Sequence, residues 1–374
     1  YSAKIPALTL LTSLGWTFLS PKQIMDYRGY KQDEVVLRPV LREELSKRPF
    51  MAGGKTCQLS EKALDNLISQ VCSPALNEGL LKANERMYNH LLYGIAVTEF
   101  VDGKKVNPTI ALIDWEHPEN NHFHFTEEFT VLRSGGVETR RPDIVCFVNG
   151  IPLAVIEAKS PAGHGKKGPT IDEGISQSIR NQLNDEIPQL FAYSQILLSI
   201  NGHDGRYGTC HTPMKFWAAW REEDITYAQM YALRNHKLST EQIHALFDHR
   251  PSVDLKWYQQ LIDGGELAVS GQDKLLISLL SPERLLEMTR FFTLFDKKTG
   301  KIVARYQQVF GIKRLLERIS TRRPDGGREG GVIWHTTGSG KSYTMVFLSK
   351  ALILHDSLKR CRIVVVTDRI DLEE

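Results

Sequence analysis

RPDIVCFVNGIPLAVIEAKSP, residues 141–161, is the stretch that decides how the first part of this chain folds. Two apolar runs flank Asn149 and Gly150, and Asn-Gly is the strongest short signal for a β-hairpin turn. The second run stays apolar for six residues and then ends in Glu157-Ala158-Lys159. A core strand does not normally close with a carboxylate and an amine two residues apart. The open end of the predicted hairpin therefore needs a chemical explanation.

The register of this hairpin decides which charged groups meet. A strict ladder from the two-residue turn pairs Asp143 with Ile156. Pro152 cannot donate to a ladder, so we expect a one-residue bulge near it, which brings Asp143 opposite Glu157. Glu157 and Lys159 lie on one face of their strand because the side-chain period is two. The sequence thus predicts three charged groups at the mouth of the hairpin.

Two nearby carboxylates repel each other unless something neutralises them. Mg²⁺ suits this task, because it prefers oxygen ligands and often takes one or two carboxylates together with waters and phosphate oxygens. A cation held by Asp143 and Glu157 would polarise a phosphodiester and lower the pKa of a bound water. Lys159 would orient that water or hold the phosphate. The alternative is a surface hairpin with a solvated Glu-Lys pair, because E-x-K is a common pattern.

Pro-Asp at residues 142–143, a spacer of 13 residues and then E-A-K resemble the signature of the PD-(D/E)xK nucleases. In that family the Asp and Glu hold Mg²⁺ and the Lys assists phosphodiester hydrolysis. The resemblance therefore implies these roles for Asp143, Glu157 and Lys159.

Some members of this nuclease superfamily carry a Q-x-x-x-Y element after the lysine. Gln189 and Tyr193 match that spacing. Gln177 is the other candidate, in a predicted helix over residues 171–183, although Asn181 stands where the Tyr would be. The choice between the two glutamines stays open from the sequence.

A second motif, GVIWHTTGSGKSYTM, occupies residues 331–345. An apolar strand pattern runs into a Gly-rich turn that opens a helix, and backbone N–H groups in such a turn face phosphates. Lys341 would reach the β- and γ-phosphates and the Ser342 hydroxyl would bind Mg²⁺, although His335 stands where the full pattern has Gly. The predicted ATP·Mg²⁺ site comprises Thr337, Gly338, Ser339, Gly340, Lys341 and Ser342.

T-G-S-G-K-S is also the usual form of this loop in superfamily 2 helicases, and the segment ARYQQ at residues 304–308 resembles their adenine-reading Q element. Gln308, with Arg305 beside it, is the better candidate and Gln307 the second; the alternative is an ordinary helix start. VTDR at residues 366–369 resembles the next helicase motif, in which Arg369 would touch nucleic-acid backbone. A P-loop kinase or GTPase is a weaker alternative, because neither flanking motif suits it. No D-E-x-H acid follows, so we expect this chain to lack a complete ATPase.

The order of nuclease hairpin, helical connector and helicase motifs resembles the restriction (R, motor) subunit of type I restriction-modification endonucleases. The resemblance implies an ATP-driven translocase that acts on double-stranded DNA with methyltransferase (M) and specificity (S) subunits and cuts far from the recognition site. Mg²⁺ and ATP are the implied cofactors. One alternative is another superfamily 2 helicase-nuclease of repair or phage defence. A second is a non-cutting module that docks DNA or another subunit.

These motifs predict an α/β protein of three parts, an N-terminal fragment of a longer subunit. Residues 1–235 should form a PD-(D/E)xK endonuclease domain with a mixed sheet flanked by helices. Residues 236–300 read as a helical connector. Residues 301–374 should be the truncated N-terminal part of a RecA-like domain, with parallel strands at 331–336 and 362–367.

Composition narrows the class without deciding it. Among 374 residues, Lys and Arg number 47 and Asp and Glu 44, so any basic DNA surface must be local. The candidates for DNA contact near the hairpin are Arg140, Arg141, Lys166 and Lys167. His117, His122 and His124 are closely spaced, but we see no placed Cys or carboxylate to complete a metal site. The five cysteines include no C-x-x-C and no apolar run is long enough to cross a membrane, so we expect a reduced cytoplasmic location without a membrane partner.

Overall fold

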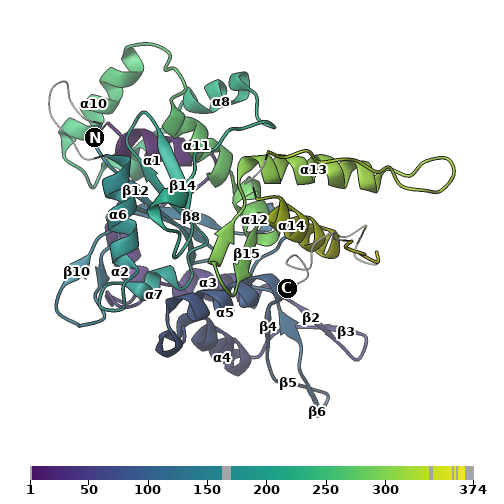
Figure 1. The fold of residues 1–374 in the computed structure, drawn as a ribbon. Helices are drawn as coiled ribbons and strands as arrows, with labels where there is room; N and C mark the ends of the chain where they lie inside the picture. The colour runs from purple at the N-terminus through teal and green to yellow at the C-terminus, as the bar shows by residue number, and fades with distance from the viewer. Residues whose placement is uncertain (1, 162–169, 337–339, 356–357, 359–360, 367–374) are drawn as a thin grey trace.

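A computed structural model describes residues 2–161, 170–336, 340–355, 358 and 361–366. Within this part of the chain the largest sheet has six strands and is mixed (Figure 1). The β1–β8 and β12–β13 pairs are parallel, and the other three neighbouring pairs are antiparallel. The predicted mixed α/β class is therefore confirmed. In spatial order the strands are β1 (Thr17–Phe18), β8 (Phe123–Glu127), β11 (Ile144–Val148), β12 (Ile151–Ala158), β13 (Ile196–Ile200) and β14 (Gly205–Gly208).

The predicted hairpin forms β11 and β12 at the centre of this sheet. Asn149 and Gly150 both have positive φ, 51° and 80°, as a tight turn of this kind requires. A Cβ on Gly150 would also lie 2.5 Å from the Leu37 carbonyl oxygen, so close backbone approach adds a second reason for glycine. The expected bulge is confirmed: Phe147 pairs with Pro152, but Cys146 pairs with Ala154.

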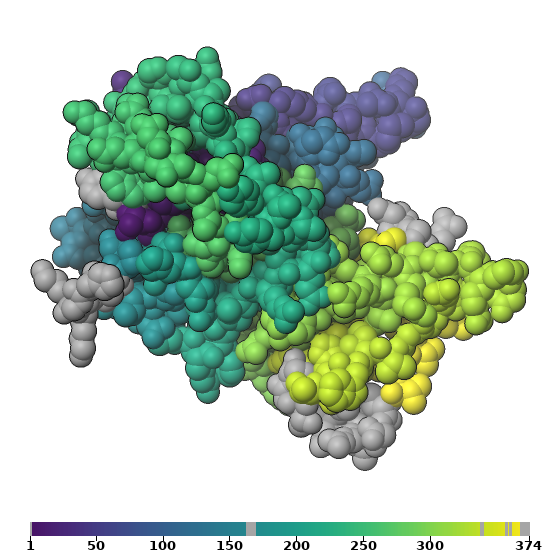
Figure 2. All heavy atoms as spheres, turned by 90° about the horizontal axis from the view of Figure 1, so that it is seen from above, coloured from purple at the N-terminus to yellow at the C-terminus, as the bar shows by residue number. Residues whose placement is uncertain are grey.

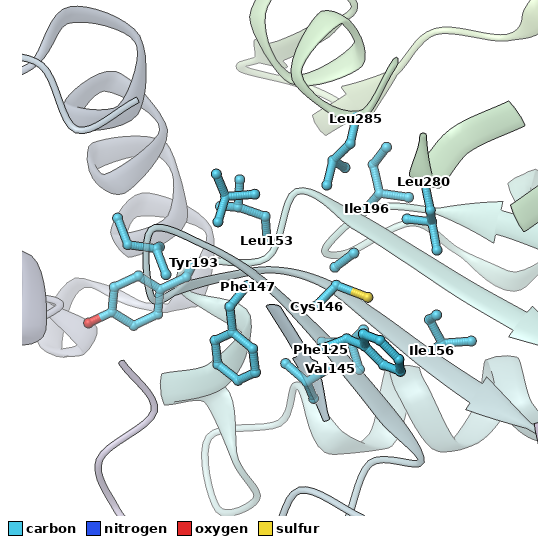
Figure 3. Close-up of a cluster of buried hydrophobic side chains, with 14 of the residues drawn as sticks. Phe125, Val145, Cys146, Phe147, Leu153, Ile156, Tyr193, Ile196, Leu280 and Leu285 are labelled. Atoms are coloured by element: carbon cyan, nitrogen blue, oxygen red, sulfur yellow. The ribbon is translucent and has the colours of Figure 1, made fainter. Parts of the chain in front are cut away.

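The central strands are apolar because they are covered on both faces. Every residue of β11 and β13 is buried, which matches their runs of β-branched and aromatic side chains. Figure 3 shows Val145, Cys146 and Phe147 of β11 within one cluster that also takes in Leu280 and Leu285 from the helical segment that follows the sheet. This contiguous core holds the two ends of the hairpin in fixed positions.

Helix α6 (Ile171–Asn181) connects β12 to its parallel neighbour β13 and packs on both strands. Acidic residues in its first turn and Arg180 in its last turn suit the helix dipole. A Cβ on Gly174 would lie 2.3 Å from Ser199 Oγ and 3.4 Å from Glu157 Cβ. The glycine therefore lets α6 approach the charged end of β12.

The last part of the chain projects from the body as helices α13 (Tyr306–Ser320) and α14 (Lys341–Leu354) (Figures 1 and 2). The parallel sheet predicted here is not formed in the described residues, because 331–336 and 361–366 carry no strand. Val332 and Trp334 are 93% and 85% exposed. Buried strands need neighbouring strands, and in the described part of the chain neither segment is paired with one. The predicted boundary at residue 300 falls inside the β15–β16 hairpin.

The remaining strands of the described residues form two-stranded ribbons. They are β2 (Phe50–Ala52) with β3 (Lys55–Cys57), β4 (Ile95–Ala96) with β7 (Thr109–Ile110), β5 (Glu99–Val101) with β6 (Lys104–Val106), β9 (Val131–Leu132) with β10 (Thr139–Arg140), and β15 (Thr293–Asp296) with β16 (Gly300–Val303).

Helices cover the sheet and build the region after it, and α1 packs against α11. Among the described helices, none combines the length and apolar character needed to cross a bilayer. The other helices are α1 (Lys4–Ser13), α2 (Pro21–Tyr27), α3 (Arg38–Ser46), α4 (Glu61–Cys72), α5 (Leu80–Tyr93), α7 (Pro188–Phe191), α8 (Tyr227–Arg234), α9 (Thr240–Phe247), α10 (Ser252–Asp263), α11 (Gly271–Leu280), α12 (Pro282–Phe291), α13 (Tyr306–Ser320) and α14 (Lys341–Leu354), with short 3-10 turns at Leu76–Glu78, Pro118–Asn120 and Met214–Phe216.

Candidate functional site

The open end of the β11–β12 hairpin brings three charged side chains together. Ile144 pairs with Ile156, so continuing the register by one residue places Asp143 opposite Glu157. Lys159 Nζ lies 3.9 Å from Asp143 Oδ2 and 3.7 Å from Glu157 Oε2. The bulge thus produces the convergence that the sequence predicts, and we call Asp143, Glu157 and Lys159 the hairpin centre.

Asp143 is held at both carboxylate oxygens. Its Oδ2 accepts a hydrogen bond of 2.8 Å from the Ala158 backbone N–H. Its Oδ1 lies 3.6 Å from the ammonium of Lys4. Asp143 is therefore fixed in orientation by β12 on one side and by helix α1 on the other.

Glu157 is the opposite case. It is 1% exposed, and neither of its carboxylate oxygens has a hydrogen-bond partner. Burial, and then the neighbouring Asp143 carboxylate, raise the pKa of Glu157 well above its usual range, while Lys159 lowers it. A buried carboxylate that accepts no hydrogen bond costs free energy and needs an explanation.

The oxygen donors of the hairpin centre fit a hard divalent cation. Two carboxylates are available, one just before β11 and one in β12 that accepts no hydrogen bond, and Mg²⁺ is bound in proteins by such groups. A bound cation would supply the missing partner of Glu157 and offset its repulsion with Asp143.

Of the two candidate glutamines, the structure brings Gln177 to the centre. Lys159 Nζ donates a hydrogen bond of 2.5 Å to Gln177 Oε1, from helix α6. Gln189 and Tyr193 instead donate to backbone carbonyls of Leu132 and Val71, at 2.6 and 2.8 Å. Tyr193 is fully buried. The structure therefore places Gln177 beside Lys159 and holds Gln189 and Tyr193 on other backbone groups.

Two residues at the centre were missed by the sequence reasoning. The Lys4 ammonium contacts the Glu128 carboxylate as well as Asp143. Glu128 has φ of 52°, and its backbone N–H donates to the Asp143 carbonyl at 2.9 Å. The available signal was that Lys4 is the one charged residue in the helical segment KIPALTLLTS.

The basic DNA candidates differ in their surroundings. Arg140 is paired with Glu186 at 2.5 Å, and this pairing engages its guanidinium. Arg141 is exposed and its Nε lies 2.5 Å from Glu128 Oε2, beside the hairpin centre. Lys166 and Lys167 lie outside the described residues.

A separate cluster contains Glu43, Glu44 and His122, whose possible ligand atoms lie within 4.8 Å of one another. The Lys47 ammonium lies 2.9 Å from Glu43 and 3.0 Å from Glu44, and the Arg48 guanidinium lies 3.8 Å from Glu44, so these carboxylates already have cationic partners. Burial lowers the pKa of the adjacent His124 to about 4. His117 is not part of this cluster; its Nδ1 lies 3.4 Å from Glu119 Oε1.

The predicted phosphate-loop helix α14 begins after Gly340. The φ of Gly340 is 86°, in the left-handed region that favours glycine. Gln308 Nε2 donates to the Gly340 carbonyl at 3.1 Å, and Gln308 Oε1 accepts from the Arg305 backbone N–H at 2.9 Å. The predicted Q element and the start of the predicted phosphate-loop helix therefore meet. Lys341 and Ser342 are exposed. Thr337, Gly338, Ser339 and Arg369 lie outside the described residues.

A cavity of about 270 Å³ opens beside this contact. One wall comes from the C-terminal segment and includes Arg305, Gln308 and Tyr343. The other wall, which includes His211 and Phe216, follows the last strand of the central sheet.

Comparison with known sequences shows which protein family this chain belongs to. Residues 1–216 match the family model of the type I restriction enzyme R protein N terminus, and residues 307–374 match that of the SWI2/SNF2 ATPases. The first match covers more than half of the chain. The chain therefore belongs to the type I restriction enzyme R protein family.

Curated relatives agree with this assignment. The chain is 30% identical over 383 residues to the type I restriction enzyme HindI endonuclease subunit of Haemophilus influenzae, a match that covers 99% of this chain and 32% of the relative. A relative from Methanocaldococcus jannaschii, provisionally named as the MjaIXP endonuclease subunit of a type I restriction enzyme, is 29% identical over 77% of this chain and 25% of its own length. The chain thus spans about a third or less of these relatives.

Proposed function

We propose that this chain is part of an R subunit that cleaves double-stranded DNA with Mg²⁺, in a reaction coupled to ATP-driven translocation. The observation that carries the proposal is the buried Glu157 carboxylate, which has no hydrogen-bond partner and lies beside Asp143 and Lys159. The relatives' names as endonuclease subunits support it. In this proposal residues 1–235 are a PD-(D/E)xK endonuclease domain, 236–300 a connector, and 301–374 the first part of a RecA-like motor domain.

Each residue of the hairpin centre then has a task. Asp143 and Glu157 hold the cation from two rigid strands, and Gln177 fixes the Lys159 ammonium toward the reacting phosphate. When bound, Mg²⁺ would polarise the phosphodiester and lower the pKa of the attacking water. Arg141, exposed beside this centre, is placed to meet the DNA backbone.

The second site is proposed to bind ATP and Mg²⁺. Gly340 starts a helix whose N-terminus favours phosphate, Lys341 and Ser342 are free to reach a nucleotide, and Gln308 with Arg305 would read the adenine. The match of residues 307–374 to SWI2/SNF2 ATPases supports this assignment. The wider assembly would include M and S subunits and act in the cytoplasm.

The proposal is tested by substituting Glu157→Gln in the full R subunit within its complete complex. Glu85→Gln, an exposed glutamate on α5, is the matched control. We expect DNA cleavage to fall at least ~100-fold in the first variant, since loss of a direct ligand should exceed the 10–100-fold effect of an outer one. ATP hydrolysis should persist in both. Undiminished cleavage by the Glu157→Gln complex would instead favour a non-cutting docking module.

A further inference from the structure

The hairpin centre is flanked by a second lysine that comes from a distant part of the sequence. Lys4, near the start of α1, is 21% exposed. Its ammonium lies 3.6 Å from Asp143 Oδ1 and also contacts Glu128. Asp143 therefore has a cation on each side, because Lys159 lies 3.9 Å from its other oxygen.

A third carboxylate near Lys4, that of Glu127, already has other partners. Glu127 lies 3.9 Å from the Lys4 ammonium, but it is paired with the Arg250 guanidinium and lies 2.8 Å from His249 Nε2. Two cationic or hydrogen-bonding partners already satisfy it. The position of the Lys4 ammonium is therefore set by Glu128 and Asp143.

Glu128 is held in place to meet Lys4. Its backbone lies in the left-handed region, at φ of 52°, which is unfavourable for a non-glycine residue. Its N–H is bonded to the Asp143 carbonyl, and Arg141 binds the far side of its carboxylate. The Glu128 and Asp143 side chains thus form a fixed pair with the Lys4 ammonium between them.

The two carboxylates proposed to bind the cation therefore differ in how far other groups already engage them. Neither Glu157 oxygen accepts a hydrogen bond, and one of them lies 3.7 Å from Lys159. Asp143 is engaged at both oxygens, since Oδ2 accepts from the Ala158 backbone N–H and Oδ1 lies 3.6 Å from the Lys4 ammonium. A positive charge at this position opposes the arrival of a divalent cation. We propose that Lys4 is a built-in counter-ion of the hairpin centre, one that competes with the divalent cation for Asp143. This inference rests on the proposed metal-dependent function.

The role makes a quantitative prediction about metal affinity in the absence of DNA and nucleotide. An ammonium about 6 Å from a divalent cation in a water-like dielectric should weaken binding by on the order of tenfold. Lys4→Met should therefore bind Mn²⁺ about tenfold more tightly than the parent chain. Lys4→Arg, which keeps the charge, should match the parent. A lysine with a merely structural role would give the opposite result, because its loss would loosen the site and weaken binding.

The test is a titration of the 374-residue chain with Mn²⁺, followed by the electron paramagnetic resonance signal of the free ion. The parent, Lys4→Met and Lys4→Arg are each titrated with and without Glu157→Gln, and the difference gives the binding that depends on Glu157. Lys82→Met is the matched control, because Lys82 is an exposed lysine paired with Glu78 at 3.9 Å. Thermal unfolding of each variant verifies that it is folded.

Tighter binding in Lys4→Met alone, with Lys4→Arg and Lys82→Met at the parent value, is the expected result. Unchanged or weaker Glu157-dependent binding in Lys4→Met overturns the counter-ion role and leaves the proposed nuclease centre intact. Equal tightening in Lys82→Met also overturns it, since general charge would then explain the effect. Absence of Glu157-dependent binding in every variant overturns the metal centre itself.

Discussion

At the scale of single residues, the hairpin centre depends on the different surroundings of chemically similar groups. Asp143 is partly exposed and held at both oxygens, whereas Glu157 is buried and open. Gln177 and Gln189 are both glutamines that follow Lys159, yet one bonds its ammonium and the other bonds a backbone carbonyl. These contrasts lead to predictions in which one residue serves as the control for another.

Gln177→Ala should reduce DNA cleavage by the full complex about 10- to 100-fold, the usual effect of losing a group that orients a catalytic or ligating side chain. Lys159 would lose the partner that fixes its ammonium. Gln189→Ala should leave the cleavage rate within about twofold. The cleavage rates of both variants are measured on the same DNA substrate. A larger loss of rate in Gln189→Ala than in Gln177→Ala would show that Gln189, and not Gln177, supports cleavage.

The residue scale also shows what could be predicted. The Asn-Gly turn, Pro152 and period-two alternation are local signals, and they were sufficient to place Asp143 opposite Glu157. Lys4 and Glu128 are separated by 124 residues in sequence, so no local pattern could pair them. The choice of Gln177 likewise needed the packing of α6 on the sheet, because the spacing rule alone favoured Gln189 and Tyr193.

At the scale of elements, α6 reaches the hairpin centre only because Gly174 has no side chain. Gly174→Ala would place a Cβ 2.3 Å from Ser199 Oγ, whose hydroxyl donates to the Ile171 carbonyl. We expect a loss of about 1–3 kcal/mol in the free energy of unfolding, the usual cost of overpacking. Adding Ser199→Ala should recover part of it, because the clashing atom is removed.

Denaturant unfolding of the two single variants and the double variant measures this coupling. Additive losses in the double variant would show that Gly174 and Ser199 do not interact as described.

A second element, α14, is docked through a half-buried lysine. The Lys350 ammonium bonds the Tyr88 hydroxyl of α5 and donates to the Thr293 carbonyl. Burial, and then the nearby Lys301, lower the pKa of Lys350 to about 7. Since an unfolded lysine titrates at about 10.4, the unfolded state binds more protons between these values, and stability should rise with pH across that range.

Lys350→Met removes this titration. The variant should gain most stability relative to the parent near pH 7, and the difference should shrink as pH approaches 10. Melting temperatures of both proteins across this range test the sign. A difference that grows with pH would mean that the Lys350 pKa is not depressed in the folded chain.

Element patterns were less reliable where neighbours decide the outcome. Apolar runs at 331–336 and 362–367 predict buried strands, but the described residues of both segments lie outside any sheet. An apolar run becomes a strand only when a neighbouring strand satisfies its backbone groups. The β11–β12 hairpin carries its own partner, which is why the same kind of pattern succeeded there.

At the scale of the whole molecule, two sites of different chemistry share one chain. The hairpin centre lies in the central sheet, and the phosphate-loop helix lies in the part that projects from it (Figure 1). The chain belongs to the type I restriction enzyme R protein family. The proposed function gives a reason for the two sites to coexist, because a nuclease that translocates would need both a cutting centre and a nucleotide site.

If the two sites have separate tasks, Lys341→Met should abolish ATP hydrolysis and translocation-dependent cleavage in the full complex. It should leave Mn²⁺ binding at the hairpin centre unchanged, because Lys341 belongs to α14 and not to that centre. ATPase assays and Mn²⁺ titration of the same variant provide both readouts. Loss of Mn²⁺ binding together with ATPase activity would show that the two sites are not separable.

The most direct test of the central claim is anomalous X-ray scattering from crystals of this chain soaked in Mn²⁺. We predict one peak bonded to carboxylate oxygens of both Asp143 and Glu157, absent in the Glu157→Gln variant. A parent crystal with Mn²⁺ bound elsewhere and none between these two carboxylates would contradict the proposed nuclease centre.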